Sequence, residues 1–261
     1  IEENAEPILD IKVSDGRAGE GASDWFLHFD HQELEEGPMG HLIEDRHIRE
    51  ALKANITKSK QIEYIYNTEV ISKSVDDTGV SLNLSDGRIL RSRLLIGCDG
   101  RNSNIAKWSN ISHIGWDYNQ SALVCAISHE KPHYGVAHQF FTPSGPLAIL
   151  PLPGNKSSIV WTETKDKAKD INVMCDEDYL SALSPVIGNF LGPISLVGDR
   201  FSYPLGLSIA ESFISSCTVL VGDSAHGIHP LAGQGLNLGL KDIAALTEVL
   251  ALAKRRGENF S

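Results

Sequence analysis

The sequence VLVGDSAHGIHPLAGQGLNLGLKD, Val219–Asp242, places acidic, serine, histidine and glycine residues directly after an apolar run. The apolar residues up to Val221 predict a buried strand, and the residues from about Gly233 onward predict a long helix. Asp223 would then stand at the carboxyl end of a strand, which is where open α/β sheets bind their ligands. The segment therefore predicts an α/β domain and a functional site within it.

Two kinds of site are poorly matched by this segment. Ser224 and His226 would suggest a serine hydrolase, but they are close neighbours in the chain, and a catalytic triad is normally assembled from distant segments. The G-x-S-x-G motif of the α/β-hydrolases is also missing. Asp223, His226 and His229 offer three metal ligands, but their spacing matches no familiar metal-binding motif. We therefore expect neither a hydrolase nor a metal site.

A cofactor cradle fits the segment better. The Asp223 carboxylate could accept hydrogen bonds from sugar or ribityl hydroxyls, and Gly233 and Gly235 would let a flat ring approach the backbone. The amides of Gly235, Leu236 and Asn237 would open a helix, and a helix N-terminus stabilises negative charge. A glycine-rich turn that merely caps the helix has the same spacing, so the pattern alone leaves both interpretations open.

The rest of the chain contains a second strand of the buried type, at Leu94–Cys98, which ends in Asp99-Gly100 and precedes a short helical run. Turn signals separate several β-rich stretches, and apolar periodicity predicts two more helices. Strands are expected within residues 9–13, 24–30, 63–90, 120–160 and 193–205, and helices within residues 41–56 and 177–191. This order predicts an α/β (α+β) fold, a nucleotide-type domain with a mostly antiparallel β domain inserted in it.

Composition narrows the class of protein. The 261 residues are 41% hydrophobic and 22% charged, which is ordinary for a globular protein, and the net charge of -11 argues against nucleic-acid binding. Four cysteines without a CxxC pair indicate free, mostly buried thiols in a reducing compartment. No apolar run approaches the ~18 residues of a membrane span, and no signal peptide is recognisable. We expect a cytoplasmic protein.

Two segments carry a resemblance to a known family. VGDSAHGIHPLAGQGLNLGLKD and LLIGCDGRNSNIAK resemble the GD and DG motifs of the FAD-dependent aromatic-ring hydroxylases, the class A flavoprotein monooxygenases, and occur in that family's order. GPLAILPLPGNKSSIVWTE resembles the ubiquinone-biosynthesis branch. The resemblance implies a para-hydroxybenzoate-hydroxylase-like fold with a Rossmann-like FAD-binding domain, here incomplete. It places residues 1–30 and 112–210 in the substrate-domain sheet, and residues 31–111 and 211–261 in the FAD-binding domain.

The resemblance also implies roles for individual residues. Pro230 matches the proline beside the reacting edge of the flavin and is the catalytic candidate. Asp45 stands where the family often has Gln or Asn, and Ala106 stands where the DG motif usually ends in arginine. The implied cofactor-binding residues are Asp45, Asp99, Gly100, Gly222, Asp223, Gly233, Gly235, Leu236 and Asn237.

The implied reaction is hydroxylation of the aromatic ring of a polyprenylated phenol in ubiquinone biosynthesis, with FAD as cofactor and NAD(P)H and O₂ as co-substrates. Substrate-facing candidates are Gln139, Phe140 and Phe141, of which at least half should instead pack in the core. We expect no nucleic-acid partner, and either peripheral contact with the inner membrane or membership of a ubiquinone-biosynthesis complex.

The dinucleotide fingerprint of the family is not found. GEGAS, residues 19–23, follows no buried strand and opens no helix, so it is no GxGxxG motif. We therefore expect a fragment that lacks the N-terminal GxGxxG unit and the C-terminal part, and that by itself binds FAD weakly and is inactive. The alternative is a truncated, non-catalytic fragment or an assembly subunit that binds no FAD.

Overall fold

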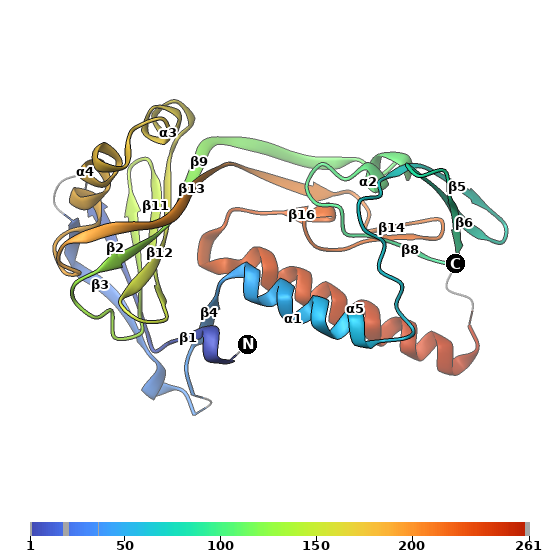
Figure 1. Cartoon of the computed structure of the whole chain (residues 1–261), viewed down its shortest axis with the longest axis horizontal. Coiled ribbons are helices and arrows are strands. Elements are labelled where there is room, and N and C mark those ends of the chain that lie inside the picture. Colours follow the sequence, from blue (N-terminus) through green and yellow to red (C-terminus); the bar gives the residue numbers. More distant parts are fainter. Residues whose placement is uncertain (1, 18–20, 36, 259–261) are drawn as a thin grey trace. The chain divides into compact units, whose positions relative to one another are not determined.

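The computed structural model describes residues 2–17, 21–35 and 37–258. Contacts within the chain divide it into two compact units, each built from two stretches of sequence. Two long strands, β9 (His113–His129) and β13 (Ile194–Ala210), run from one unit into the other (Figure 1). Unit 1 comprises Ile1–Tyr64 and Asn119–Pro204, and unit 2 comprises Ile65–Tyr118 and Leu205–Ser261.

The main element of unit 1 is a sheet in which β9 is followed in space by β12, β11, β10, β2 and β3. Neighbouring strands are antiparallel, except that β10 and β2 are parallel. The sequence predicted this mostly antiparallel arrangement from short apolar runs broken by glycine and proline. The strand bounds are β2 (Asp10–Arg17), β3 (Gly21–Asp30), β10 (Val136–Thr142), β11 (Gly145–Leu152) and β12 (Lys156–Thr164).

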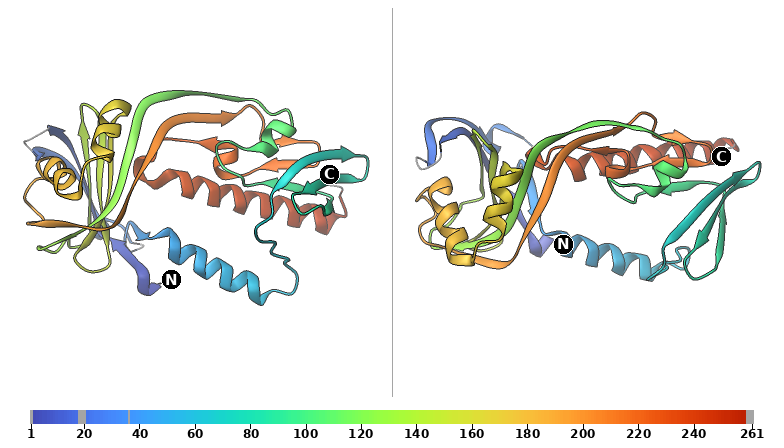
Figure 2. Two further views of the ribbon diagram at one scale, coloured as in Figure 1. Left: turned by 45° about the horizontal axis from the view of Figure 1, so that its top comes forward. Right: turned by 90° about the horizontal axis from the view of Figure 1, so that it is seen from above.

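One face of this sheet carries the core of unit 1. Because side chains alternate between the faces of a strand, Phe140 and Trp161 point to this face, where both are almost fully buried. Helices α3 (Lys165–Asn172) and α4 (Asp176–Ile187) pack on the same face (Figure 2). The second helix ends earlier than predicted, because Gly188 adopts a φ of +87° that stops helical hydrogen bonding.

Residues 31–64 belong to unit 1 by their contacts, although the sequence predicts them in the FAD-binding domain. The helix predicted from residue 41 begins later, because Gly40–Ile43 form a strand. The functional domain of residues 31–64 stays a prediction. Of the stretch GEGAS, residues 21–23 begin β3, and residues 19–20 lie outside the described residues. The remaining elements of unit 1 are η1 (Glu2–Asn4), β1 (Ala5–Ile8), η2 (His31–Glu33), β4 (Gly40–Ile43), which pairs with β1, and α1 (Asp45–Lys58).

Unit 2 contains the two strands that the sequence predicts, β8 (Leu95–Gly97) and β15 (Thr218–Leu220), as parallel neighbours, but β8 is not buried on both faces, because Ile96 is 45% exposed. Parallel strands end at the same edge of a sheet, so the loops after them, which begin near Asp99 and Asp223, emerge at one edge. The other elements are β5 (Val70–Asp76), β6 (Gly79–Leu84), β7 (Ile89–Ser92), α2 (Asn104–Trp108), β14 (Ile214–Ser215), η3 (Gly222–Ser224), β16 (His226–Gly227), η4 (Leu231–Gly233) and α5 (Gln234–Arg256).

Two predictions about the whole chain can be compared with the structure. The four cysteines are free, as expected, but only Cys125 and Cys217 are buried, whereas Cys98 and Cys175 are exposed. Within the described ranges, no helix is both long enough and apolar enough to cross a bilayer.

Candidate cofactor site

The turn that follows β15 is held by Ser224. The Ser224 side chain is fully buried, and its hydroxyl donates to the Gly97 carbonyl at 2.5 Å, which ties the turn to β8. The same oxygen lies 3.2 Å from the Val221 amide, from which it accepts. A buried hydroxyl with these partners is not presented to a substrate, and the His226 ring, whose Nε2 bonds Asp242 and whose Nδ1 has no partner among the described residues, makes no hydrogen bond to it. The structure therefore gives the hydrolase hypothesis no support, and Ser224 acts as a structural residue.

The buried His226 is paired with Asp242 of helix α5. Asp242 Oδ2 accepts from His226 Nε2 at 2.7 Å and from the Gly222 amide at 2.9 Å. A carboxylate only accepts, so Nε2 carries a proton, while the buried Nδ1 has no partner in the described part of the chain. Gly222 itself has a φ of +65°, a left-handed conformation that suits glycine. Asp242 thus fixes the backbone directly before Asp223.

The Asp223 side chain stays half exposed, at 50%, at the end of this turn. Its Oδ2 atom lies 3.6 Å from Arg101 Nε, and the Arg101 guanidinium also donates to the Ile228 carbonyl at 2.8 Å. Burial, and then the charge of Arg101, lower the pKa of His229. The half-exposed Asp223 carboxylate, at the sheet edge where the loops after β8 and β15 emerge, is able to accept hydrogen bonds from a ligand.

The three residues of the metal hypothesis do not converge. His226 is committed to Asp242, and the ring of His229 packs on Tyr118, with 5.6 Å between the ring centroids. Among the described residues, the ligand atoms that come close enough together to hold a metal ion belong to another set, in unit 1: Asp10, Asp30 and His31.

The segment from Pro230 to Asn237 forms an exposed loop and helix start. Gly233 has a φ of +63°, and a Cβ atom at Gly233 or Gly235 would meet no atom within 4 Å. No side chain caps the N-terminus of α5, so its first amides lack a side-chain acceptor. The Leu236 side chain is 60% exposed. This stretch leaves open space, free donors and the positive end of a long helix at one place.

The DG loop, residues 98–103 between β8 and α2, binds its own acidic side chain, that of Asp99. The Asp99 carboxylate accepts from the Ser103 hydroxyl at 2.6 Å and from the Ile105 amide at 3.1 Å, which caps the short helix α2. Gly100 has a φ of +79°. Ala106, where the family motif usually has arginine, is buried in the core of unit 2, so a charged side chain would not fit there without rearrangement.

Asp45 lies in unit 1, at the first turn of α1, where its carboxylate pairs with Arg49 at 2.5 Å. The other predicted cofactor residues lie in unit 2. Whether Asp45 shares their site therefore stays a prediction. Sequence reasoning missed Arg101 and Asp242. Both stand inside the quoted motifs, but nothing in their spacing shows which residues they contact.

The substrate-facing candidates divide between the two faces of the unit 1 sheet. Phe140 is buried in the core against α3 and α4, but it is one residue of three, whereas at least half of the set was expected to pack there. Gln139 and Phe141 alternate with it and lie on the opposite face, where Phe141 is 41% exposed. The Gln139 amide donates to the Leu147 carbonyl at 3.2 Å.

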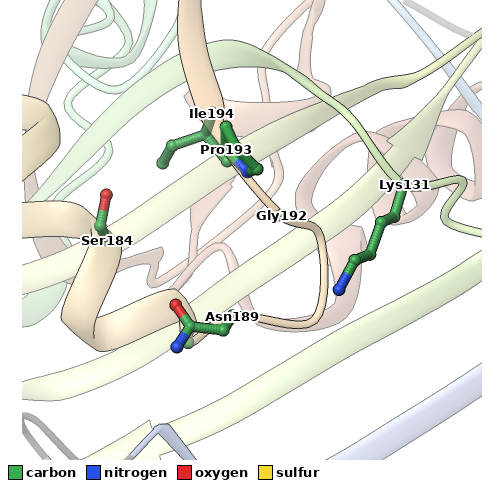
Figure 3. Close-up of a pocket in the computed structure, with 7 residues that line it drawn as sticks. Lys131, Ser184, Asn189, Gly192, Pro193 and Ile194 are labelled. Carbon is green, nitrogen blue, oxygen red and sulfur yellow. The ribbon is translucent and has the colours of Figure 1, made fainter.

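A hollow of about 550 Å³ in unit 1 lies apart from the predicted residues. Figure 3 shows it at the end of α4 and the start of β13, with the Lys131 ammonium and the Asn189 amide at its rim. The Ser184 hydroxyl that lines it donates to the Leu180 carbonyl of its own helix. None of the candidate site residues lines this hollow.

Comparison with known proteins gives a consistent assignment. A family model described as "FAD binding domain" matches residues 17–259. Ubiquinone hydroxylase UbiL of Rhodospirillum rubrum is 41% identical over 253 residues, which cover 97% of this chain and 58% of that protein. The 3-demethoxyubiquinol 3-hydroxylase of Escherichia coli (strain K12) is 31% identical over 233 residues, which cover 89% of this chain and 59% of that protein. The chain thus spans somewhat more than half the length of these relatives.

The structural comparison agrees. The crystal structure of pqsL, described as a probable FAD-dependent monooxygenase from Pseudomonas aeruginosa, matches with a TM-score of 0.80 and 19% identity, covering 97% of this chain and 70% of that chain. This likeness confirms the predicted fold class, a para-hydroxybenzoate-hydroxylase-like α/β fold with a mostly antiparallel sheet. The match over residues 17–259 shows that the chain belongs to the FAD binding domain family.

Proposed function

We propose that this chain is part of an FAD-dependent hydroxylase that acts on the aromatic ring of a polyprenylated phenol in ubiquinone biosynthesis, with NAD(P)H and O₂ as co-substrates. The observation that carries the proposal is the exposed, glycine-lined and uncapped start of α5 in the same unit as the exposed Asp223 carboxylate. Similarity to the ubiquinone hydroxylases of Rhodospirillum rubrum and Escherichia coli supports the reaction class and favours it over a non-catalytic subunit.

The donors and acceptors of unit 2 fit a flavin. Asp223 would accept from a ribityl hydroxyl, and the amides of Gly235, Leu236 and Asn237 would donate to the pyrimidine oxygens. The helix dipole adds stabilisation where a reduced flavin carries negative charge. Pro230, at the exposed loop before them, would lie beside the reacting edge.

When bound, FAD supplies the redox chemistry, taking a hydride from NAD(P)H and activating O₂ for transfer of one oxygen atom. The protein's part is to hold the ring, keep the substrate ring in reach and exclude water. Asp99 and Gly100 would act indirectly, since Asp99 is occupied in shaping its own loop. Asp45 is proposed to assist at the flavin side chain.

Unit 1 offers a surface suited to an apolar substrate. The sheet face opposite the core is lined, in register across four strands, mainly by uncharged residues; among those described, Asp15, opposite Phe141, and Lys156, opposite Leu152, add charges. Such a face suits a neutral phenol with an isoprenoid tail. The Gln139 side chain supplies this face with an amide group. Ala137 and Thr162 on this face are buried, Phe141 is exposed, and the other residues are partly exposed: Ile11, Val13, Gln139, Pro146, Ala148, Leu150, Ser158 and Val160.

An isoprenoid substrate would reside in lipid. We therefore include in the proposal peripheral contact with the inner membrane, or participation in a ubiquinone-biosynthesis complex. Vesicle co-sedimentation of the complete polypeptide, with and without the polyprenyl phenol in the bilayer, tests the membrane part.

An absorbance spectrum of the complete polypeptide, with and without added FAD, tests the cofactor. We expect a protein-bound flavin spectrum and NAD(P)H oxidation that a polyprenyl phenol stimulates. Asp223→Asn should weaken FAD binding by about tenfold or more, the effect of losing one charged hydrogen bond. Glu211→Gln, which changes another exposed acid of unit 2, is the matched control and should bind like the unaltered protein. If the unaltered polypeptide takes up no flavin, the proposed hydroxylase function is refuted, and the alternative of a non-catalytic subunit that binds no FAD is supported.

A further inference from the structure

The side chain of Arg101 joins two loops that are far apart in the sequence. Arg101 follows Gly100 in the DG loop. Its guanidinium reaches the GD loop, residues 221–233 between β15 and α5, where Nη2 donates to the Ile228 carbonyl at 2.8 Å. Its Nε atom lies 3.6 Å from Asp223 Oδ2. One arginine therefore contacts both the acid proposed to bind FAD and the backbone that leads to Pro230.

The GD loop is shaped to let this side chain pass. A Cβ atom on Gly227 would lie 2.9 Å from Arg101 Nε, 3.2 Å from its Cγ and 3.3 Å from its Cδ. Gly227 is also buried, and its φ is not in the left-handed region, so backbone conformation does not call for glycine here. The close approach of Arg101 explains why a side chain is missing at this position.

The acid of the DG loop does not compete for this role. Both oxygens of Asp99 accept from their own loop, from the Ser103 hydroxyl and the Ile105 amide. The neighbouring cation, Lys107, donates to the Asn102 carbonyl of the same loop. Of these three charged residues of the DG motif, Arg101 is the one that contacts the GD loop.

We propose that Arg101 is a positioning residue that orients Asp223 for the cofactor. This inference rests on the proposed function, because it assigns to Arg101 the orientation of a flavin contact. The guanidinium holds Oδ2 and leaves Oδ1 to accept from a ribityl hydroxyl. Through Ile228 it also fixes the loop that carries Pro230, so that the DG loop sets the geometry of the GD loop.

The test compares Arg101→Gln, Arg101→Lys and the control Lys107→Gln in the complete polypeptide, with FAD affinity measured by flavin fluorescence. We expect Arg101→Gln to weaken FAD binding by about tenfold, as the loss of one half-exposed ion pair and one hydrogen bond implies. Arg101→Lys keeps the charge but not the planar fork and should recover part of the affinity. Lys107→Gln, which removes a cation from the helix α2 that follows the DG loop, should bind like the unaltered protein.

A double-mutant comparison separates positioning from general stability. In an Asp223→Asn background, Arg101→Gln should cost much less affinity than it does alone, because its partner is already changed. Equal losses in both backgrounds, or unchanged affinity with only a lower melting temperature, would overturn the role of Arg101. If the unaltered polypeptide takes up no FAD at all, the proposed function fails, and this inference fails with it.

Discussion

Asp242→Ala should destabilise unit 2 more than any other single change at an acid of helix α5. One carboxylate oxygen, on a side chain that is 24% exposed, accepts from both the Gly222 amide and His226 Nε2. Hydrogen bonds to charged groups contribute about 1.5–3 kcal/mol each, and partial access of water to the freed donors reduces the sum, so we expect a loss of about 3 kcal/mol. At roughly 2–4 °C per kcal/mol for a protein of this size, the melting temperature should fall by about 6–12 °C.

Thermal unfolding followed by circular dichroism measures this effect in the complete polypeptide. Glu248→Ala is the matched control, because Glu248 is an exposed acid of the same helix and its loss should change stability by less than about 0.5 kcal/mol. Asp242→Asn keeps an oxygen that accepts from the Gly222 amide, and should cost less than the alanine variant. If Asp242→Ala melts at the same temperature as the Glu248→Ala control, the hydrogen bonds of Asp242 to Gly222 and His226 do not hold the turn, and the account of the site is wrong.

Three further predictions concern single residues. Ser224→Ala should lower stability by about 0.5–1.5 kcal/mol, because the Gly97 carbonyl loses one of its two donors and keeps the Val221 amide, and should leave any esterase background unchanged; an esterase activity abolished by the change would revive the hydrolase hypothesis. Burial among aromatic rings, and then the charge of Lys12, lower the pKa of His138 to about 4 from 6.5. Because the unfolded chain takes up this proton first, stability is complete above about pH 6.5 and is lost as the pH falls toward 4, and His138→Phe should flatten that loss in urea titrations. Gly235→Val should weaken FAD binding by about tenfold without lowering the melting temperature of the FAD-free protein, since its side chain enters open space; undiminished affinity would show that the ring does not approach there.

Local sequence patterns were sufficient for much of the fold. The apolar runs at Leu94–Cys98 and before Gly222 form parallel strands, and the helix predicted from about Gly233 is α5. These predictions succeed because alternation, periodicity and turn residues act within a few positions of one another. The same patterns failed where a strand that is distant in the sequence determines the local structure. The helix predicted from residue 41 is present but begins only at Asp45, because Gly40–Ile43 pair with β1.

The candidate site divides in the same way. The sequence by itself identified Asp223, the glycines and the helix start, because a strand end, a backbone without side chains and a helix N-terminus are local features. Only the tertiary structure showed that Asp99 accepts a hydrogen bond from the first turn of α2, that Asp242 holds the Gly222 amide, and that Arg101 reaches Asp223. The Arg101 contacts join positions more than a hundred residues apart, and no local pattern encodes which distant groups the folded chain brings within hydrogen-bonding distance.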